Sequence, residues 1–270
     1  MPARLRPDTF FALQTGQATR PGGQACTLTV HDLGILQVPS GRLGACDPFV
    51  RLDDPAIEDV PPGSYPVRLT VADVSEDQDG SHLREAYLSV VLREGEVASV
   101  AYARDPEGVV GGNSELGRVG VDAGTVAFVD AEAVPLCMPP PSRWYDDVFD
   151  SGADDSWFAR MDDESDLRAG SANIVMPRAR HGENVVLTHS GWGDGVYPLV
   201  FTRDAAGELL AVHIDLLVAG PVEHKGDQDG AVTPRPISEP SESFEPSERG
   251  VDREPVPDPS PSWWRRLLGR

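Results

Sequence analysis

The sequence predicts an α+β fold that is mainly antiparallel β, with a few short helices and a disordered C-terminal tail. Apolar and polar residues alternate in several runs, which is the period of a half-buried strand. Gly and Pro contribute 27 and 25 of the 270 residues, so turns are frequent. After residue 219 the composition becomes rich in Pro, Ser and Glu. We therefore expect one β-rich domain over residues 1–219.

The first strand patterns lie near the N-terminus. Residues 24–30 (QACTLTV) and 33–38 (LGILQV) flank His31 and Asp32, which predicts a hairpin or a bend. Residues 65–74 (YPVRLTVADV) predict a half-buried strand, because alternate positions carry its apolar side chains. The side chains expected on that buried face are Tyr65, Val67, Leu69 and Val71.

Two hairpins are predicted further along the chain. Residues 83–92 and 97–103 are separated by Arg-Glu-Gly-Glu. Residues 195–203 and 208–218 are separated by Asp-Ala-Ala-Gly. Each pair of apolar runs joined by a short Gly-containing turn is typical of adjacent antiparallel strands.

Short helices are expected between these hairpins, over residues 130–137 and 156–161. Ser156 can cap the second helix, and Asp154 and Asp155 suit its N-terminal dipole. The surrounding stretch 146–166 carries nine acidic residues and one arginine, which is typical of a solvated loop or an exposed helix face. It lacks the regular ligand spacing and central Gly of a calcium loop.

The net charge of −21 disfavours nucleic acid as a partner, because such a surface repels phosphates. The three cysteines, Cys26, Cys46 and Cys137, form no CxxC pair, which argues against a disulfide framework or a thiolate zinc site. The N-terminus has no apolar run typical of a signal peptide. We therefore expect a reduced, cytoplasmic protein without a cofactor.

Three segments are dense in Gly and Asp: SGRLGACDP (40–48), GVDAGTVAFVD (120–130) and SGWGDGVY (190–197). Together with PPGSYPVRLTV (61–71), and taken in order, they resemble a bacterial family of domains of unknown function, the one numbered 4241, over residues 30–218. The resemblance implies one fold unit and a bacterial origin. It implies no mechanism, since no activity of that family can be carried over.

The segment SGWGDGVY has a structural and a functional interpretation. In the first it is a turn that feeds a strand, Trp192 plugs the end of the sheet, and Asp194 accepts N–H bonds within its own turn. In the second it is a ligand-binding loop with a glycine floor, an acidic group at Asp194, and His189 at the rim. The ligand-binding candidates are Gly191, Trp192, Gly193, Asp194 and Gly195.

Catalysis would require these segments to meet. The weak catalytic candidates are Asp122, Asp194 and His189, which could serve a metal-assisted hydrolase. His213 and Asp215 alternate along a strand, and a hydrogen-bonded buried pair explains them as well as metal ligation does. No HxH, HExxH or DxD spacing is present. We therefore assign no metal site, and interpret Asp122 as the cap of a turn that starts a helix.

The C-terminal part divides into two predicted units. Residues 220–262 form an acidic linker too poor in apolar side chains to fold. Residues 263–270 (WWRRLLGR) form a short amphipathic peptide that would fold only on docking to a protein or to a membrane surface. Its docking residues are Trp263, Trp264, Arg265, Arg266, Leu267 and Leu268.

These observations favour an interaction or regulatory module that does not catalyse a reaction and has a protein partner. By analogy alone, an acidic β-rich bacterial domain resembles the immunity proteins that cover a cationic nuclease site. The alternative class is the hydrolase described above. The two differ in whether Asp122, Asp194 and His189 meet in a deep pocket.

Overall fold

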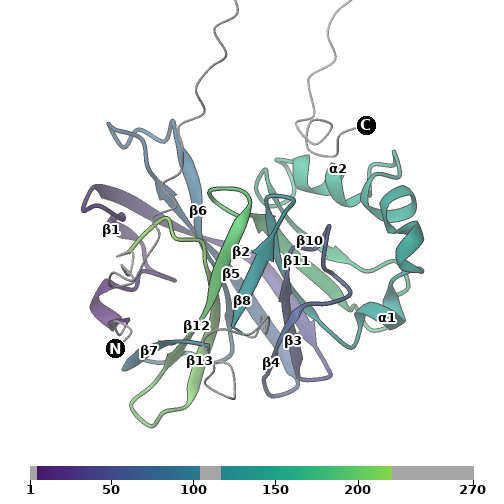
Figure 1. Cartoon of the computed structure of the whole chain (residues 1–270), viewed down its shortest axis with the longest axis horizontal. Coiled ribbons are helices and arrows are strands. Elements are labelled where there is room, and N and C mark those ends of the chain that lie inside the picture. Colours follow the sequence, from purple (N-terminus) through teal and green to yellow (C-terminus); the bar gives the residue numbers. More distant parts are fainter. Residues whose placement is uncertain (1–4, 104–116, 221–270) are drawn as a thin grey trace, which may run out of the picture. The chain divides into compact units, whose positions relative to one another are not determined.

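The computed structural model describes residues 5–103 and 117–220, which form two antiparallel sheets and a few short helices (Figure 1). The predicted fold class is confirmed. The predicted linker from residue 221 onward and the docking peptide 263–270 lie outside the described residues. Within the described ranges, no helix is long and apolar enough to cross a membrane.

The larger sheet has eight strands in the order β1-β2-β5-β6-β13-β12-β7, and β8 pairs with β12 beside that path. Its strands are β1 (Gly16–Thr19), β2 (Ala25–Val38), β5 (Gly63–Asp73), β6 (Leu83–Val91), β7 (Ser99–Tyr102), β8 (Arg118–Val121), β12 (Gly195–Arg203) and β13 (Leu209–Asp215).

The smaller sheet has five strands in the order β10-β11-β9-β3-β4. Its strands are β3 (Arg42–Cys46), β4 (Ala56–Asp59), β9 (Thr125–Asp130), β10 (Ser171–Val175) and β11 (Asn184–His189). The helical segments are η1 (Pro7–Thr9), α1 (Val134–Cys137), η2 (Pro141–Arg143), η3 (Tyr145–Phe149) and α2 (Trp157–Asp162).

The apolar core lies between the two sheets. In the larger sheet, Leu69 pairs with Leu88, and Leu88 pairs with Ile214, so the three side chains share one face. In the smaller sheet, Phe128 and Val186 are also fully buried and belong to the same cluster. The predicted buried face of residues 65–71 is confirmed, since its four apolar side chains lie in this core.

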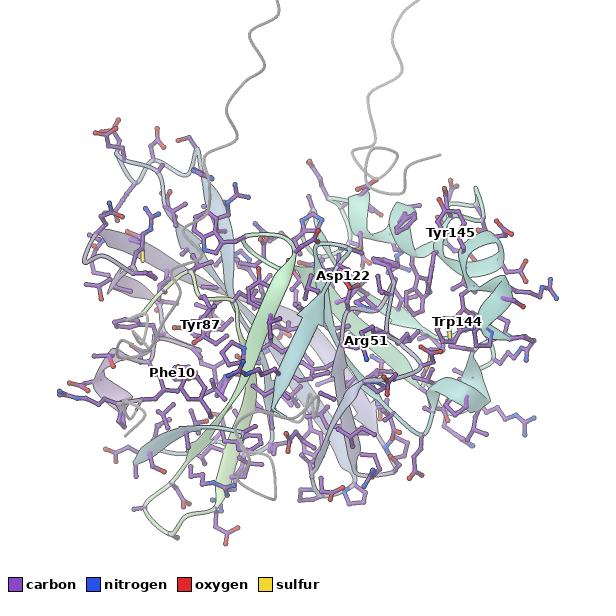
Figure 2. All side chains as sticks on the ribbon, in the orientation of Figure 1. Phe10, Arg51, Tyr87, Asp122, Trp144 and Tyr145 are labelled. Atoms are coloured by element: carbon purple, nitrogen blue, oxygen red, sulfur yellow. The ribbon has the colours of Figure 1, made fainter. Side chains whose placement is uncertain are left out.

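The other face of the larger sheet carries buried polar side chains. The imidazole of His213 hydrogen-bonds through Nδ1 to Ser89 Oγ at 2.8 Å and through Nε2 to Thr202 Oγ1 at 3.1 Å. Phe10 covers this row, and its ring centroid lies 5.1 Å from that of His213 and 5.0 Å from that of Tyr87 (Figure 2). Burial lowers the pKa of His213 to about 3, so its imidazole is neutral.

An aromatic cluster fixes the helical segments beside the smaller sheet. The centroid of the Phe49 ring lies 5.1 Å from that of Phe149 and 4.7 Å from that of Phe158. Ser156 caps α2 as predicted, because its Oγ accepts the Ala159 N–H at 3.3 Å. We call residues 146–166 the acidic lobe. Its nine acidic side chains are all exposed, which confirms the solvated interpretation.

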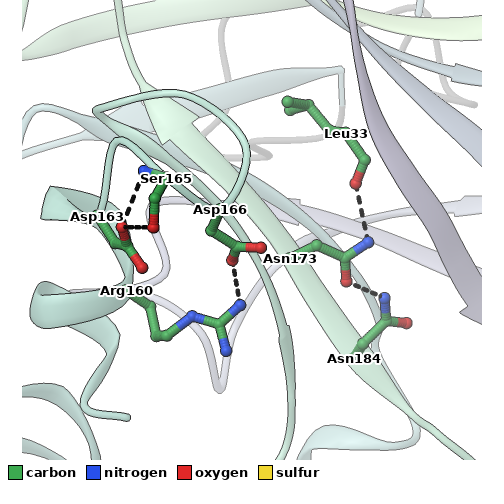
Figure 3. A network of polar contacts seen from close by, with 7 residues as sticks. All are labelled: Leu33, Arg160, Asp163, Ser165, Asp166, Asn173 and Asn184. Atoms are coloured by element: carbon green, nitrogen blue, oxygen red, sulfur yellow. Dashed lines mark hydrogen bonds and ion pairs between the residues drawn. The ribbon is translucent and has the colours of Figure 1, made fainter. Parts of the chain in front are cut away.

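A hairpin or a bend was predicted over residues 24–38, and the hairpin is wrong, because residues 25–38 form one strand, β2, that bends at a register shift between Asp32 and Ile35. Gly34, at a φ of +83°, bulges the strand without reversing it. The bulge frees the Leu33 carbonyl, which accepts a hydrogen bond from Asn173 at 2.8 Å, and Asn184 donates to Asn173 at 2.6 Å (Figure 3). The bulge therefore joins β2 to the smaller sheet.

The predicted hairpin of 195–203 with 208–218 is confirmed as β12 and β13. The predicted hairpin of 83–92 with 97–103 is wrong, because β6 pairs with β5 and β13 whereas β7 pairs with β12. The connecting segment passes the end of β13 instead of turning back. The N–H groups of Leu92 and Arg93 both bond to the Leu210 carbonyl there.

Candidate functional site

The second and third Gly/Asp segments form two turns that lie side by side and cross between the sheets. Residues 122–124 connect β8 in the larger sheet to β9 in the smaller one, and residues 190–194 connect β11 back to β12. Val121 pairs with Gly195 before the crossing, and Thr125 pairs with His189 after it. The strand pair therefore changes sheets as a unit, at one end of the sandwich.

Direct bonds lock the two crossing turns together. Ser190 N–H donates to the Gly124 carbonyl at 2.9 Å, and Gly124 N–H donates to Asp194 Oδ1 at 3.0 Å. Within the second turn, the Gly193 carbonyl accepts bonds from Ser190 Oγ at 2.6 Å and from the Tyr197 hydroxyl at 2.8 Å. The structural interpretation placed Asp194 within its own turn, but its Oδ1 binds the neighbouring one.

The first Gly/Asp segment supplies Asp47, which is fully buried behind the same turns. Its Oδ2 accepts the N–H groups of Asp122 at 3.0 Å and Ala123 at 2.7 Å. Its Oδ1 accepts the Thr125 hydroxyl at 2.9 Å and the Phe49 N–H at 3.2 Å. Burial raises the pKa of Asp47 even though these bonds favour the carboxylate. All three segments therefore meet at residues 122–125.

The turn 190–194 also packs closely on β6. Gly191 has a φ of +71°, and a Cβ built there would lie 2.5 Å from the Glu85 carbonyl oxygen. Glycine is required at this position both for its backbone angle and for this approach. The next residue, Trp192, places its ring beside Arg84, whose Cζ lies 5.3 Å from the ring centroid. Trp192 is 48% exposed, so it does not plug the end of the sheet.

His189 precedes these turns and lies beside an ion pair between β6 and the segment that leads into β10. Arg168 Nη1 is 2.6 Å from Glu85 Oε1, and the two side chains are 19% and 7% exposed. Burial lowers the pKa of His189, and the Glu85 carboxylate opposes part of that shift. The imidazole is therefore neutral at pH 7, next to charges that already neutralise each other.

The three catalytic candidates occupy different surroundings. Asp122 (Figure 2) and Asp194 are exposed on the crossing turns, whereas His189 is half-buried beside Glu85. The turn at Asp122 leads into β9, so the expected helix start is wrong. Asp215 and His213 lie on the Phe10-covered face of the larger sheet. Across the described ranges, no group of three or more His, Cys, Asp or Glu side chains is arranged to hold a metal ion.

The cysteines have structural surroundings. Cys26, Cys46 and Cys137 are free thiols and all are buried. They lie in β2, β3 and α1 respectively. Burial is the main cause that raises the pKa of Cys46, and the neighbouring Asp47 adds to it. A thiol kept protonated in this way is not an activated nucleophile.

Sequence reasoning missed four residues of this region. Asp47 lies within the first Gly/Asp segment, whose pattern does not show that this side chain organises a distant turn. Arg84, Glu85 and Arg168 lie in segments that carry no motif, and only the packing of β6 against the turn and against the start of β10 brings them together.

A shallow depression lies at the other end of β12. It is lined by Gly95, Glu96, Ala98, Asp204, Ala205 and Ala206.

One family model matches the chain over residues 36–214, and its description is "Protein of unknown function (DUF4241)". The matched range contains all three Gly/Asp segments and their meeting point. Neither a curated protein nor a solved structure gives a significant match.

Proposed function

We propose that this chain, which belongs to the DUF4241 family of proteins of unknown function, is a protein-binding module that covers a cationic surface of a partner. In this proposal it does not catalyse a reaction. Three aspartates of the Gly/Asp segments support that view, since Asp47, Asp130 and Asp194 each accept backbone N–H bonds that shape turns. Carboxylates engaged in this way are poorly placed to move protons for a substrate.

The observation that carries the proposal is the acidic lobe. Its apolar side chains, including Phe149, Trp157 and Met161, are buried, so its backbone is held against the sandwich. Its carboxylates point outward, and local arginines pair with two of them, Asp147 with Arg143 and Asp166 with Arg160 (Figure 3 shows the second pair). A fixed field of one sign attracts a partner of the opposite sign and accelerates encounter.

Calorimetric titration against the purified products of the neighbouring genes tests the proposal. We expect at least one basic protein to bind, with an affinity that falls as salt increases. The variant Asp154→Asn/Asp155→Asn/Glu164→Gln should weaken that binding about tenfold or more at low salt.

The matched control is Glu76→Gln/Asp77→Asn/Glu96→Gln, which removes three exposed charges outside the lobe. It should change the affinity by less than about threefold. If both variants lose the same affinity, the acidic lobe contributes only through the net charge of the protein and is not a specific binding surface. If no basic neighbour binds, or if a neighbour is consumed as a substrate, the proposed function is wrong.

A further inference from the structure

We propose that Trp192 is the anchor of this interaction, and that its exposed indole receives a Lys or Arg side chain of the partner. This inference rests on the proposed function and adds to it a specific contact. The acidic lobe attracts cations through its charge, whereas an exposed indole beside carboxylates favours a positively charged group at one position.

The first support is exposure combined with rigidity. Trp192 is 48% exposed, yet hydrogen bonds hold the turn after it, because the Gly193 carbonyl accepts the Ser190 hydroxyl and Asp194 Oδ1 accepts the Gly124 N–H. Its own N–H bonds to the Ser190 carbonyl at 2.8 Å. A large ring carried on a backbone that is already held loses less conformational entropy when a partner covers it. Tryptophan is also among the residues most often found as binding anchors.

The second support is the charge around the ring. Asp194 lies two residues along the same turn, and Asp122 lies on the turn bonded to it, and both are exposed. At the end of α2, Asp162 is close enough to raise the pKa of His189, the residue that precedes this turn. These exposed carboxylates attract an incoming cation and repel an incoming anion.

The third support is Arg84. Its guanidinium already sits 5.3 Å from the centre of the Trp192 ring. Within the described part of the chain, its buried Nε has no hydrogen-bond partner. The indole therefore already holds one guanidinium from this chain, and its remaining exposed surface can accept a second cation from the partner.

The test uses the full chain and two fluorescein-labelled probes, acetylated and amidated tetra-arginine and tetra-glutamate, followed by anisotropy. We expect tetra-arginine to bind and Trp192→Leu, which keeps apolar bulk but removes the ring, to weaken it about fivefold or more. Trp192→Phe should retain part of the affinity. Unchanged urea midpoints would show that the variants fold.

Tyr145→Leu is the matched control, because Tyr145 is a 45% exposed aromatic residue beside the acidic lobe whose ring already packs edge-on against Phe158. It should change tetra-arginine binding by less than about twofold. Failure of tetra-arginine to bind, preference for tetra-glutamate, or equal effects of Trp192→Leu and Tyr145→Leu would each overturn the anchor. If only the acidic-lobe variant Asp154→Asn/Asp155→Asn/Glu164→Gln loses tetra-arginine binding, Trp192 is not the anchor, but the proposed function still holds.

Discussion

Asp47 accepts four hydrogen bonds while fully buried, and three of its donors belong to residues 122–125. In Asp47→Asn the amide NH₂ would face N–H donors, which leaves buried groups without partners. We predict a loss of about 2–4 kcal/mol in the free energy of unfolding, measured by urea denaturation. Asp122→Asn changes an exposed side chain in the same turn and should cost less than about 0.5 kcal/mol. Similar losses in both would contradict this role for Asp47.

Asp215 should give the protein a distinct pH dependence. Burial raises its pKa from 3.8 to about 7, although Oδ1 accepts the Leu217 N–H at 2.9 Å. Between these pH values the folded chain keeps a proton that the unfolded chain has released. This group therefore makes the free energy of unfolding fall as pH rises from about 4 to about 7.

Asp215→Asn tests that sign, because asparagine keeps an acceptor for Leu217 and cannot ionise. We predict that the variant is more stable than the parent chain at pH 8, by an amount on the order of 2–4 kcal/mol, and that the difference shrinks toward pH 4. Urea midpoints across this range measure it. A variant that is less stable at pH 8 would mean that Asp215 gains more from its charge than burial costs.

At the scale of elements, the crossing turns depend on one glycine more than on another. At Gly191 the φ is positive and an added Cβ would lie 2.5 Å from the Glu85 carbonyl oxygen, whereas Gly193, at a φ of +91°, faces open space. We predict that Gly191→Ala costs about 3 kcal/mol or more and Gly193→Ala about 1 kcal/mol, from thermal or urea unfolding. If both variants lose the same free energy of unfolding, β6 moves away from the turn enough to accommodate the added Cβ at Gly191.

The sequence predicted elements where local pattern and pairing agree. The β12–β13 hairpin and the Ser156 cap follow from residues within a few positions of one another. The prediction failed where a segment pairs with a strand or a residue that is distant in the sequence. The Gly-containing segment after β6 predicts a hairpin with the next strand, but β6 pairs with β13, which offers a longer apolar strand. Likewise, a glycine such as Gly34 can either bulge a strand or end it. That choice depends on Asn173, whose contact with Leu33 no local pattern displays.

At the scale of the whole molecule, the single β-rich domain over 1–219 stays a prediction that truncation can test. The buried apolar cluster draws its members from residues 10–219. A chain ending after residue 223 should therefore keep the melting temperature of the full chain to within about 2 °C. A fall of more than about 5 °C would mean that the C-terminal part contributes to folding.

The candidate site was predictable in its composition but not in its arrangement. The Gly and Asp segments marked the three places that meet, and Gly191 to Asp194 lie on one turn, on which Trp192 and Asp194 are exposed. The sequence could not show that Asp47 occupies the centre, or that Arg84 lies over Trp192. Both contacts join segments that are distant in the sequence, and neither has a spacing signature.

The positions of the three buried thiols have a practical consequence. One lies in the larger sheet, one in the smaller sheet and one in α1, so each reports on a separate part of the fold. A thiol reagent added to the native chain can modify them only when that part opens. The order in which Cys26, Cys46 and Cys137 become labelled would therefore record which part separates first, without any introduced probe.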